Sequence, residues 1–410
     1  HLDDQAWISH FGRFDPLPGS LQSPLALRYH GHQFRVYNPE IGDGRGFLFA
    51  QLRDDRGRLM DLGTKGSGQT PWSRFGDGRL TLKGGVREIL ATEMLEALGV
   101  ETSRSFSLIE TGEDLHRGDE PSPTRSSVLV RLSHGHIRIG TFQRLAFERD
   151  AENMRRLVGY VLANFYGETA GEDGPERLLD HVVSRTARLA ARYMAAAFVH
   201  GVLNSDNINV TGESFDYGPW RFAPTWDPAF TAAYFDHAGL YAFGRQPEAI
   251  HWDAAQLAVS LRLLIDAEPL IAVLDSFGER YQRAVSDSIL WRLGLKPRDA
   301  ASDRALVQAI ERALRGTATP IDRFFFDAFG GALPDESPYT DPPFEEARSL
   351  LAGYAPRAPR DHPYWRGSAP CSMLIEEVEQ IWAPIAQGDD WSRFEAKIAA
   401  VRDMGSALAG

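Results

Sequence analysis

Short apolar runs bounded by Gly, Asp and Lys dominate the first third of the chain and predict strands. The runs at 47–52 and 59–65 flank a polar turn, so we expect them to form a hairpin. Further strands are expected at 106–110 and 128–132, around a polar loop at 111–126. Residues 1–45 are rich in aromatics, Pro and Gly and show no clear period, which predicts irregular segments packed over a surface.

Helical periodicity takes over from about residue 150. Within the strand-rich part, one helix is predicted at 83–98, where Val86, Leu90 and Met94 share an apolar stripe. The pattern predicts an α+β chain with a boundary near residue 145, dividing it into parts 1–145 and 146–410. The helices expected in the second part are 154–165, 178–199, 254–265, 270–293, 305–314, 344–351 and 373–385.

Composition narrows the class of protein. With 410 residues and 43% hydrophobic content, the chain can form one large two-lobed unit or two to three ordinary domains. With a net charge of -12 the chain has no overall positive charge that would attract nucleic acid or an anionic membrane, so any polyanion must bind in a local basic pocket. No apolar run is long enough for a membrane span, and no signal peptide is visible. The single cysteine, Cys371, fits a reducing compartment, and we expect a cytoplasmic protein in which this thiol is packed rather than nucleophilic.

The segment 200–218 carries most of the candidate chemistry and follows an apolar helix. Asp206, Asn207 and Asp216 supply hard oxygen ligands of the kind that suit Mg²⁺. The spacing is similar to that of a protein-kinase loop, except that Val202 stands where the catalytic base is expected. Asp206 is the carboxylate that could replace this base. The alternative is ordinary turn chemistry, because Asp, Asn and Ser readily bond their own backbone.

Three segments of the first part could complete a phosphate site. The glycine-rich turn 42–46 precedes a strand, and its backbone amides could approach a phosphate, although such turns also occur for steric reasons. Lys65 ends the second strand, and a kinase-like site pairs such a lysine with a helix glutamate. The helical wheel favours Glu93 over Glu88 as that partner.

The segment 131–140 gathers two arginines and two histidines. Arg131 and Arg138 make it the best local polyanion pocket in an acidic chain, since guanidinium groups bond phosphate oxygens in pairs and stay charged. Zinc binding by His134 and His136 is disfavoured, because no third ligand lies near them in the sequence.

Taken together and in order, these segments resemble the selenoprotein O family, kinase-like protein adenylyltransferases formerly classed as pseudokinases. The similarity covers about residues 29–265, and its motifs are specific as a set rather than singly. The segments that carry it are 29–34, 42–45, 65–71, 73–79, 87–88, 136–140, 200–207, 216–219 and 241–247.

The resemblance implies a two-lobed, protein-kinase-like fold in which ATP binds turned around relative to a kinase. AMP rather than the γ-phosphoryl group would then pass to a Ser, Thr or Tyr hydroxyl of an acceptor protein. The base would be Asp206, the ligands of Mg²⁺ or Mn²⁺ would be Asn207 and Asp216, and Glu88 rather than Glu93 would pair with the lysine. The implied ATP contacts are Gly42, Gly44, Arg45, Lys65, Asp77, Gly78, Arg131, Arg138 and Asp216.

Two departures from the family pattern and two other functions stay open. Many relatives carry a selenocysteine or cysteine near the C-terminus, whereas this chain ends in GSALAG, so redox regulation through such a pair is not expected. The region after about residue 330 does not match the family clearly. The alternatives are a kinase-like small-molecule phosphotransferase, which Val202 disfavours, and a silent nucleotide-binding scaffold. We expect a monomer that binds neither nucleic acid nor a membrane.

Overall fold

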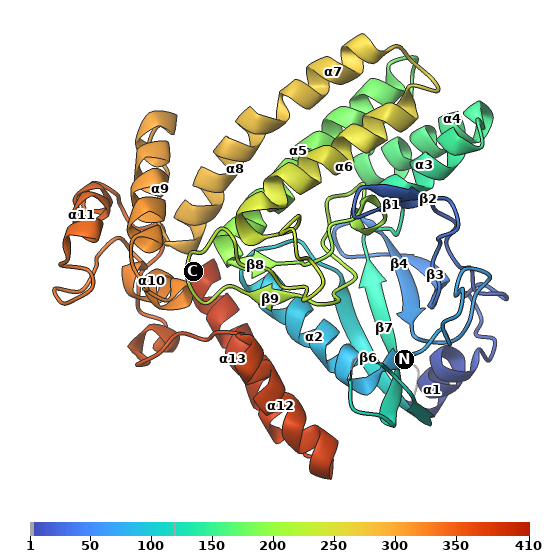
Figure 1. Ribbon diagram of the computed structural model, residues 1–410, viewed down its shortest axis with the longest axis horizontal. Coiled ribbons are helices and arrows are strands. Elements are labelled where there is room, and N and C mark those ends of the chain that lie inside the picture. The colour runs from blue at the N-terminus through green and yellow to red at the C-terminus, as the bar shows by residue number, and fades with distance from the viewer. Residues whose placement is uncertain (1–3, 119) are drawn as a thin grey trace.

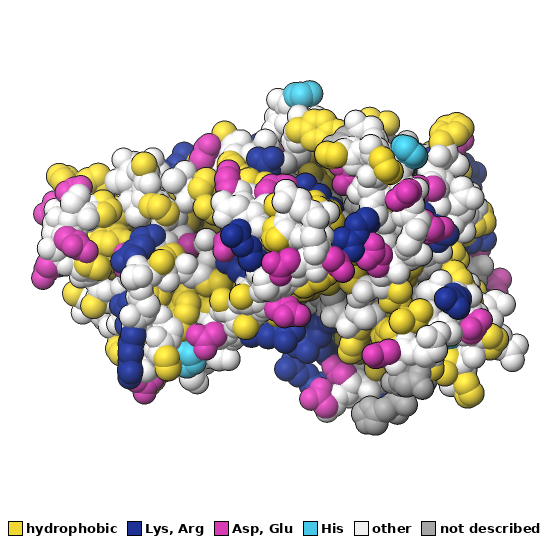
Figure 2. Space-filling view, turned by 90° about the horizontal axis from the view of Figure 1, so that it is seen from below, with side chains coloured by type: hydrophobic (Ala, Val, Ile, Leu, Met, Phe, Trp, Pro, Cys, Tyr) yellow, Lys and Arg dark blue, Asp and Glu magenta, His cyan; other side chains and the backbone are white. Residues whose placement is uncertain are grey.

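The computed structural model describes residues 4–118 and 120–410. Figure 1 shows a strand-rich N-terminal part, with helices making up the rest of the molecule. The predicted order of a strand-rich part followed by a helical part is therefore confirmed. Although the chain carries a net charge of -12, Figure 2 shows Lys and Arg side chains gathered in a hollow on the face seen from below.

An antiparallel sheet forms the frame of the N-terminal part. Its strands are β3 (Gly46–Arg53), β4 (Leu59–Lys65), β7 (Thr124–Ser133) and β5 (Leu80–Thr81) in this spatial order, and β6 (Arg104–Leu115) also pairs with β7. The predicted hairpin is confirmed, with Gly46 opposite Lys65. The loop predicted at 111–126 was too long, because β6 and β7 extend into it. One face of an antiparallel sheet can face water, so its strand ends carry polar residues that look like a loop in the sequence.

The first 45 residues are more regular than predicted. They form α1 (Asp4–Arg13) and a small hairpin of β1 (Gly31–Gln33) and β2 (Val36–Asn38). Phe11 of α1 packs against Phe49 and Val130 of the sheet. The prediction of an irregular segment was wrong here because tertiary packing, which a short helix needs for its stability, is not visible in local periodicity. Part of that prediction, residues 1–3, lies outside the described residues.

Three predicted helices in the C-terminal part needed correction. The helix predicted at 254–265 lies at Gln246–Leu261 in the structure. The helix predicted at 178–199 ends earlier, because Ala197 adopts a left-handed backbone (φ 57°) and Phe198–Val199 forms β8, which pairs with β9 (Arg221–Phe222). The helix predicted at 270–293 is interrupted at Ser276. Among the described residues, no helix is both long and apolar enough to cross a membrane. The helices are α2 (Leu82–Ala97), α3 (Ile139–Phe147), α4 (Ala151–Val161), α5 (Gly174–Ala196), α6 (Gln246–Leu261), α7 (Ala267–Asp275), α8 (Phe277–Arg292), α9 (Ala300–Arg315), α10 (Ile321–Ala328), α11 (Glu345–Leu351), α12 (Ile375–Gly388) and α13 (Ser392–Ala409), with short π or 3₁₀ turns at Leu162–Tyr166, Ser205–Asn207, Phe243–Arg245, Pro342–Phe344 and Pro363–Arg366.

The last two helices return to the N-terminal part and lie beside α2 (Figure 1). Arg402 of α13 pairs with Glu93 of α2 at 2.6 Å. Lys83 at the start of α2 pairs with Glu379 of α12 at 2.7 Å. A side chain at position 405 would press on Ala97, so Gly405 lets the two helix backbones approach closely. The end of the chain thus supports the outer face of α2.

A buried ion pair joins two of the C-terminal helices, α8 and α10. Arg292 of α8 contacts Asp322 of α10 at 2.6 Å, and both side chains are shielded from water. Asp322→Ala leaves this guanidinium buried without its carboxylate, so we expect the free energy of unfolding to fall by about 3–5 kcal/mol. The exposed pair between Arg312 and Glu346 provides the control, since Glu346→Ala should cost less than about 1 kcal/mol. Urea denaturation measures both, and equal losses would contradict the assignment.

Candidate active site

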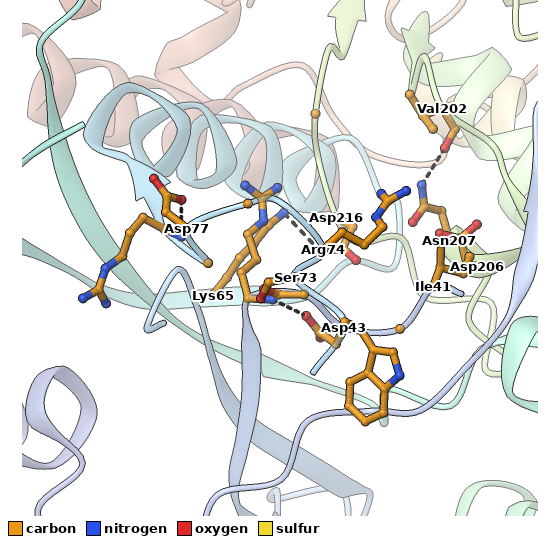
Figure 3. Close-up of a pocket in the computed structure, with 18 of the residues that line it drawn as sticks. Ile41, Asp43, Lys65, Ser73, Arg74, Asp77, Val202, Asp206, Asn207 and Asp216 are labelled. Atoms are coloured by element: carbon orange, nitrogen blue, oxygen red, sulfur yellow. Dashed lines mark hydrogen bonds and ion pairs between the residues drawn. The ribbon is translucent and has the colours of Figure 1, made fainter. Parts of the chain in front are cut away.

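The candidate residues converge on one open cleft with a volume of about 710 Å³. Figure 3 shows Asp206 and Asn207 on one side of this cleft, Asp77 on the other, and Lys65 and Asp216 between them. The cleft is lined by Gly42, Gly44, Arg45, Lys65, Asp77, Gly78, Arg131, Arg138, Asp206, Asn207 and Asp216. Glu88 does not line it but contacts Lys65 from behind.

The carboxylate of Asp216 is the electrostatic centre of the site. Its Oδ1 lies 2.7 Å from Arg131 Nη1 and 3.1 Å from Lys65 Nζ, and its Oδ2 lies 3.0 Å from Arg138 Nη2. Burial alone would raise the pKa of Asp216, but these three cations hold that pKa well below its usual value. The preceding Phe215 carbonyl lies 3.0 Å from His200 Nε2, and this contact helps to hold the segment that carries Asp216.

Lys65 is held by the glutamate that the resemblance indicated. Glu88 is 2% exposed and its Oε1 contacts Lys65 Nζ, whereas Glu93 pairs with Arg402 on the other side of α2. The helical-wheel preference for Glu93 was therefore wrong. The wheel failed because α2 is covered on one side by the sheet and on the other by α13, so apolar residues mark both faces.

Arg138 is buried deeply and makes several contacts at once. Its guanidinium lies over the rings of Tyr29 and Phe215, with distances of 4.5 and 4.7 Å to the ring centroids. Its Nη1 donates to the hydroxyl of Tyr29 at 3.1 Å and to the backbone carbonyl of Asp206 at 3.0 Å. Since Nη2 contacts Asp216, this one side chain connects both candidate aspartates.

Asp206 has a very different environment from Asp216. Its Oδ1 is buried and has no hydrogen-bond partner in the described structure. Burial is the largest influence on this carboxyl and raises its pKa to about 6, against the opposing effect of Arg138. An unpartnered carboxylate with such a pKa is suited to accept a proton near neutral pH.

Neighbouring elements clamp the turn that carries Asp206. Ser205 Oγ donates to Gln143 Oε1 of α3 at 2.6 Å and accepts the backbone N–H of His32 at 2.7 Å. Asn204 Oδ1 accepts the backbone N–H of Phe34 at 3.0 Å. The sequence had singled out segment 29–34 only as a family motif, and its structural role is to hold the Asp206 turn. Gln143 was missed altogether, since nothing in its local sequence marks it.

The arrangement fits a hard divalent cation. Asn207 Nδ2 donates to the Val202 carbonyl at 3.0 Å, which leaves its amide oxygen for a ligand. This oxygen and the ionised Asp216 are the donors that Mg²⁺ uses together with phosphate oxygens and water. Within the described residues no cluster of three His, Cys, Asp or Glu side chains could hold a metal by itself.

Glycines allow two loops to close around the cleft entrance. A Cβ at Gly42 would lie 2.5 Å from the ring of Trp72, so only glycine lets this backbone pass. Gly78 has φ 70°, and a Cβ there would lie 2.2 Å from the backbone of Gly68. Asp77, which precedes Gly78, forms an ion pair with Arg117 at 2.7 Å.

The structure adds cleft residues that the sequence analysis did not single out. Asp43 Oδ1 accepts the backbone N–H of Gly46 at 2.7 Å and thereby shapes the glycine-rich turn. Ser73 Oγ donates to the carbonyl of Gly44 and ties the second loop to the first. The signal that could have found them was present, since both lie in or beside the family motifs. The added lining residues include Tyr29, Asp43, Trp72, Ser73, Arg74, Arg79 and Arg117.

The histidines of segment 131–140 face away from the cleft. His136 Nδ1 lies 3.4 Å from Asp61 Oδ2, and the backbone N–H of His134 donates to both carboxylate oxygens of Glu213 at 3.0 and 3.1 Å. Burial raises the pKa of Glu213 to about 8. Outside the cleft, burial also raises the pKa of the Cys371 thiol, which packs against the core.

Comparisons with known proteins show one matching family and several similar proteins with a common name. A family model described as protein adenylyltransferase SelO matches residues 1–331. The protein nucleotidyltransferase YdiU of Synechococcus elongatus is 50% identical over 319 residues, 77% of this chain and 64% of that protein. The YdiU protein of Synechococcus sp. is 42% identical over 99% of this chain and 87% of its own length. That of Gloeobacter violaceus is 43% identical over 98% of this chain and 86% of its own length. The aligned region thus spans just under two thirds of the Synechococcus elongatus relative.

Because Glu213 is buried, we predict that the free energy of unfolding falls as the pH rises. Its pKa of about 8 in the fold exceeds the value of 4.5 that it has when exposed, so the folded state binds the extra proton between these values. The contribution of Glu213 to the free energy of unfolding is therefore fully present below about pH 4.5 and is lost as the pH rises through 8. Glu213→Gln should remove this loss and unfold at a higher temperature than the wild type at pH 8.5, with little difference at pH 5.

The exposed Glu279→Gln is the control and should leave the pH profile of the melting temperature unchanged. A Glu213→Gln profile that parallels the wild type would show that this carboxyl is ionised in the fold.

Proposed function

Since the chain belongs to the family of the protein adenylyltransferase SelO, we propose that it transfers AMP from ATP to a Ser, Thr or Tyr hydroxyl of an acceptor protein and releases pyrophosphate. The family is kinase-like, and the fold described above agrees with this class. The observation that carries the proposal is that one cleft holds both the Asp216 carboxylate among three cations and the Asp206 carboxyl, whose buried Oδ1 has no hydrogen-bond partner. A residue with these properties at position 206 supports transfer even though Val202 stands at the kinase base position.

The cations would bind the triphosphate. Lys65, Arg131 and Arg138 surround Asp216 and line the cleft, so phosphate oxygens entering it meet fixed positive charge. Gly42 and Gly44 expose backbone that can approach a phosphate closely, and Arg45 adds an exposed guanidinium. Asn207 and Asp216 would hold Mg²⁺, or Mn²⁺ in its place, which would neutralise phosphate charge when bound.

Asp206 would act as the general base. The acceptor oxygen attacks the α-phosphorus of ATP and forms the new O–P bond while the bond to the bridging oxygen breaks. The bonding electron pair leaves with pyrophosphate, and the hydroxyl proton passes to Asp206. A base in this position is typically worth about 10²- to 10⁴-fold in rate.

Two further properties belong to the same proposal. The single cysteine fits a reducing compartment such as the cytoplasm, and the net charge of -12 argues against a nucleic-acid partner. The proposal also takes the protein to be a monomer. Sedimentation at micromolar concentration tests the oligomeric state.

Separately labelled ATP tests the reaction. The purified protein is incubated with a divalent cation and ATP labelled at the α- or the γ-phosphate, with self-labelling and added proteins as acceptors. We expect covalent label from the α-position only, together with pyrophosphate. Transfer from the γ-position would instead indicate a kinase-like phosphotransferase, and binding without transfer would favour the silent scaffold.

Two aspartate variants separate chemistry from binding. Asp206→Ala should keep ATP binding and lose transfer by about 10²-fold or more, because only the proton acceptor is removed. Asp216→Ala should lose both, because the three cations repel one another without it. Equilibrium binding of labelled ATP and the initial rate of α-label transfer measure the two effects. Normal transfer by Asp206→Ala would overturn the base assignment.

A further inference from the structure

The cations that line the cleft differ in whether they already have partners. Lys65, Arg131 and Arg138 are buried and paired with Asp216. Two others are paired near the entrance, Arg79 with Glu113 and Arg117 with Asp77. In the described part of the chain, the side chains of Arg45 and Arg74 line the cleft without any hydrogen bond or ion pair. Arg45 already has a role in the proposed function, whereas Arg74 has none.

The loop around Arg74 is built to present this side chain. Ser73 Oγ accepts the backbone N–H of Thr70 at 2.8 Å and donates to the carbonyl of Gly44. The backbone N–H of Gly76 donates to the Ser73 carbonyl at 2.8 Å and closes the turn. Between these anchors Arg74 adopts a left-handed backbone with φ 53°. Such a backbone is uncommon for a residue with a side chain and is often found at functional sites.

The guanidinium of Arg74 lies toward the side of the cleft that carries Asp206. Figure 3 shows the Arg74 side chain extending across the cleft toward Asp206 and Asn207. Arg138 and Arg74 are the two cations among the main electrostatic influences on the Asp206 carboxyl. Arg138 is 2% exposed and is occupied by Asp216, Tyr29 and the Asp206 carbonyl. Arg74 is therefore the cation beside Asp206 that is available to a substrate.

We propose that Arg74 is a further catalytic residue of this site, which contacts the non-bridging oxygens of the α-phosphoryl group while transfer takes place. This inference rests on the proposed function. The acceptor oxygen loses its proton to Asp206 and therefore attacks from the Asp206 side, so the phosphorus under attack lies within reach of the same side. As the new O–P bond forms and pyrophosphate departs with the electron pair of the broken bond, negative charge collects on those oxygens. Arg74 neutralises it.

An arginine suits this task for two reasons. Its guanidinium stays charged at every accessible pH and can bond two phosphoryl oxygens in parallel. Because it is not committed to a protein carboxylate, it can strengthen its contacts as charge develops, which lowers the barrier rather than the ground state. Removing one such donor from a polar site typically reduces the rate by about 10²- to 10³-fold.

The test compares Arg74→Ala, Arg74→Lys and wild type in the transfer of α-label from ATP to protein. We expect Arg74→Ala to lower kcat by about 10²-fold while KM for ATP changes less than about threefold. Arg74→Lys should recover part of the loss, since it restores the charge without the paired geometry. Arg283→Ala removes an exposed arginine on α8 and controls for net charge, with kcat expected to equal that of the wild type.

The outcomes separate this inference from the proposed function. If the wild type transfers α-label and Arg74→Ala does so with an unchanged kcat, the role of Arg74 is overturned and the proposed function stands. A loss confined to KM would also overturn it, because Arg74 would then bind the ground state only. Absence of α-label transfer by the wild type would overturn the proposed function and this inference with it. Equal melting temperatures for the variants exclude misfolding as the cause of a reduced kcat.

Discussion

The carboxylate of Asp216 is the contact on which the site depends. It receives Lys65 from the end of β4, Arg131 from β7 and Arg138 from the residue before α3. Three cations this close would repel one another in a buried setting, and a single ionised carboxylate makes their grouping possible. The same contact joins the sheet to the loop of the helical part. This one group thus sets the electrostatics of the cleft and adds a contact between the two parts.

Asp206 and Asp216 lie in one loop and are given opposite chemistry by their surroundings. Cations hold the pKa of Asp216 well below its usual value, so this residue is a fixed charge. Burial raises the pKa of Asp206 to about 6 and leaves one of its oxygens without a partner, so this residue can exchange a proton. Two groups of one type whose environments separate their pKa values provide an ionised group and a base in the same site.

The C-terminal helices have a structural part in this arrangement. The family model ends at residue 331, but two relatives align over 99% and 98% of this chain, so the expectation that the region after about 330 does not match the family was wrong. In this region α12 and α13 pack beside α2, the helix that carries Glu88. Their ion pairs use Lys83 and Glu93 on the outer side of α2. Glu88 faces inward to Lys65. These helices therefore support the element that positions the buried lysine, which gives a role to a region that the sequence motifs left without one.

The sequence alone determined that a strand-rich part precedes a helical part, and it determined the central hairpin and the loop carrying Asp206, Asn207 and Asp216. These features follow from local periodicity and motif spacing, which act over a few residues. For the lysine partner the helical wheel indicated Glu93 and the family resemblance indicated Glu88, and the contact of Glu88 with Lys65 in the structure decided between them. The clamp of Gln143 on Ser205 and the direction of the Arg74 side chain toward Asp206 (Figure 3) also came from tertiary structure alone. Such contacts join segments far apart in the chain, and their burial and charge depend on neighbours that local sequence does not specify.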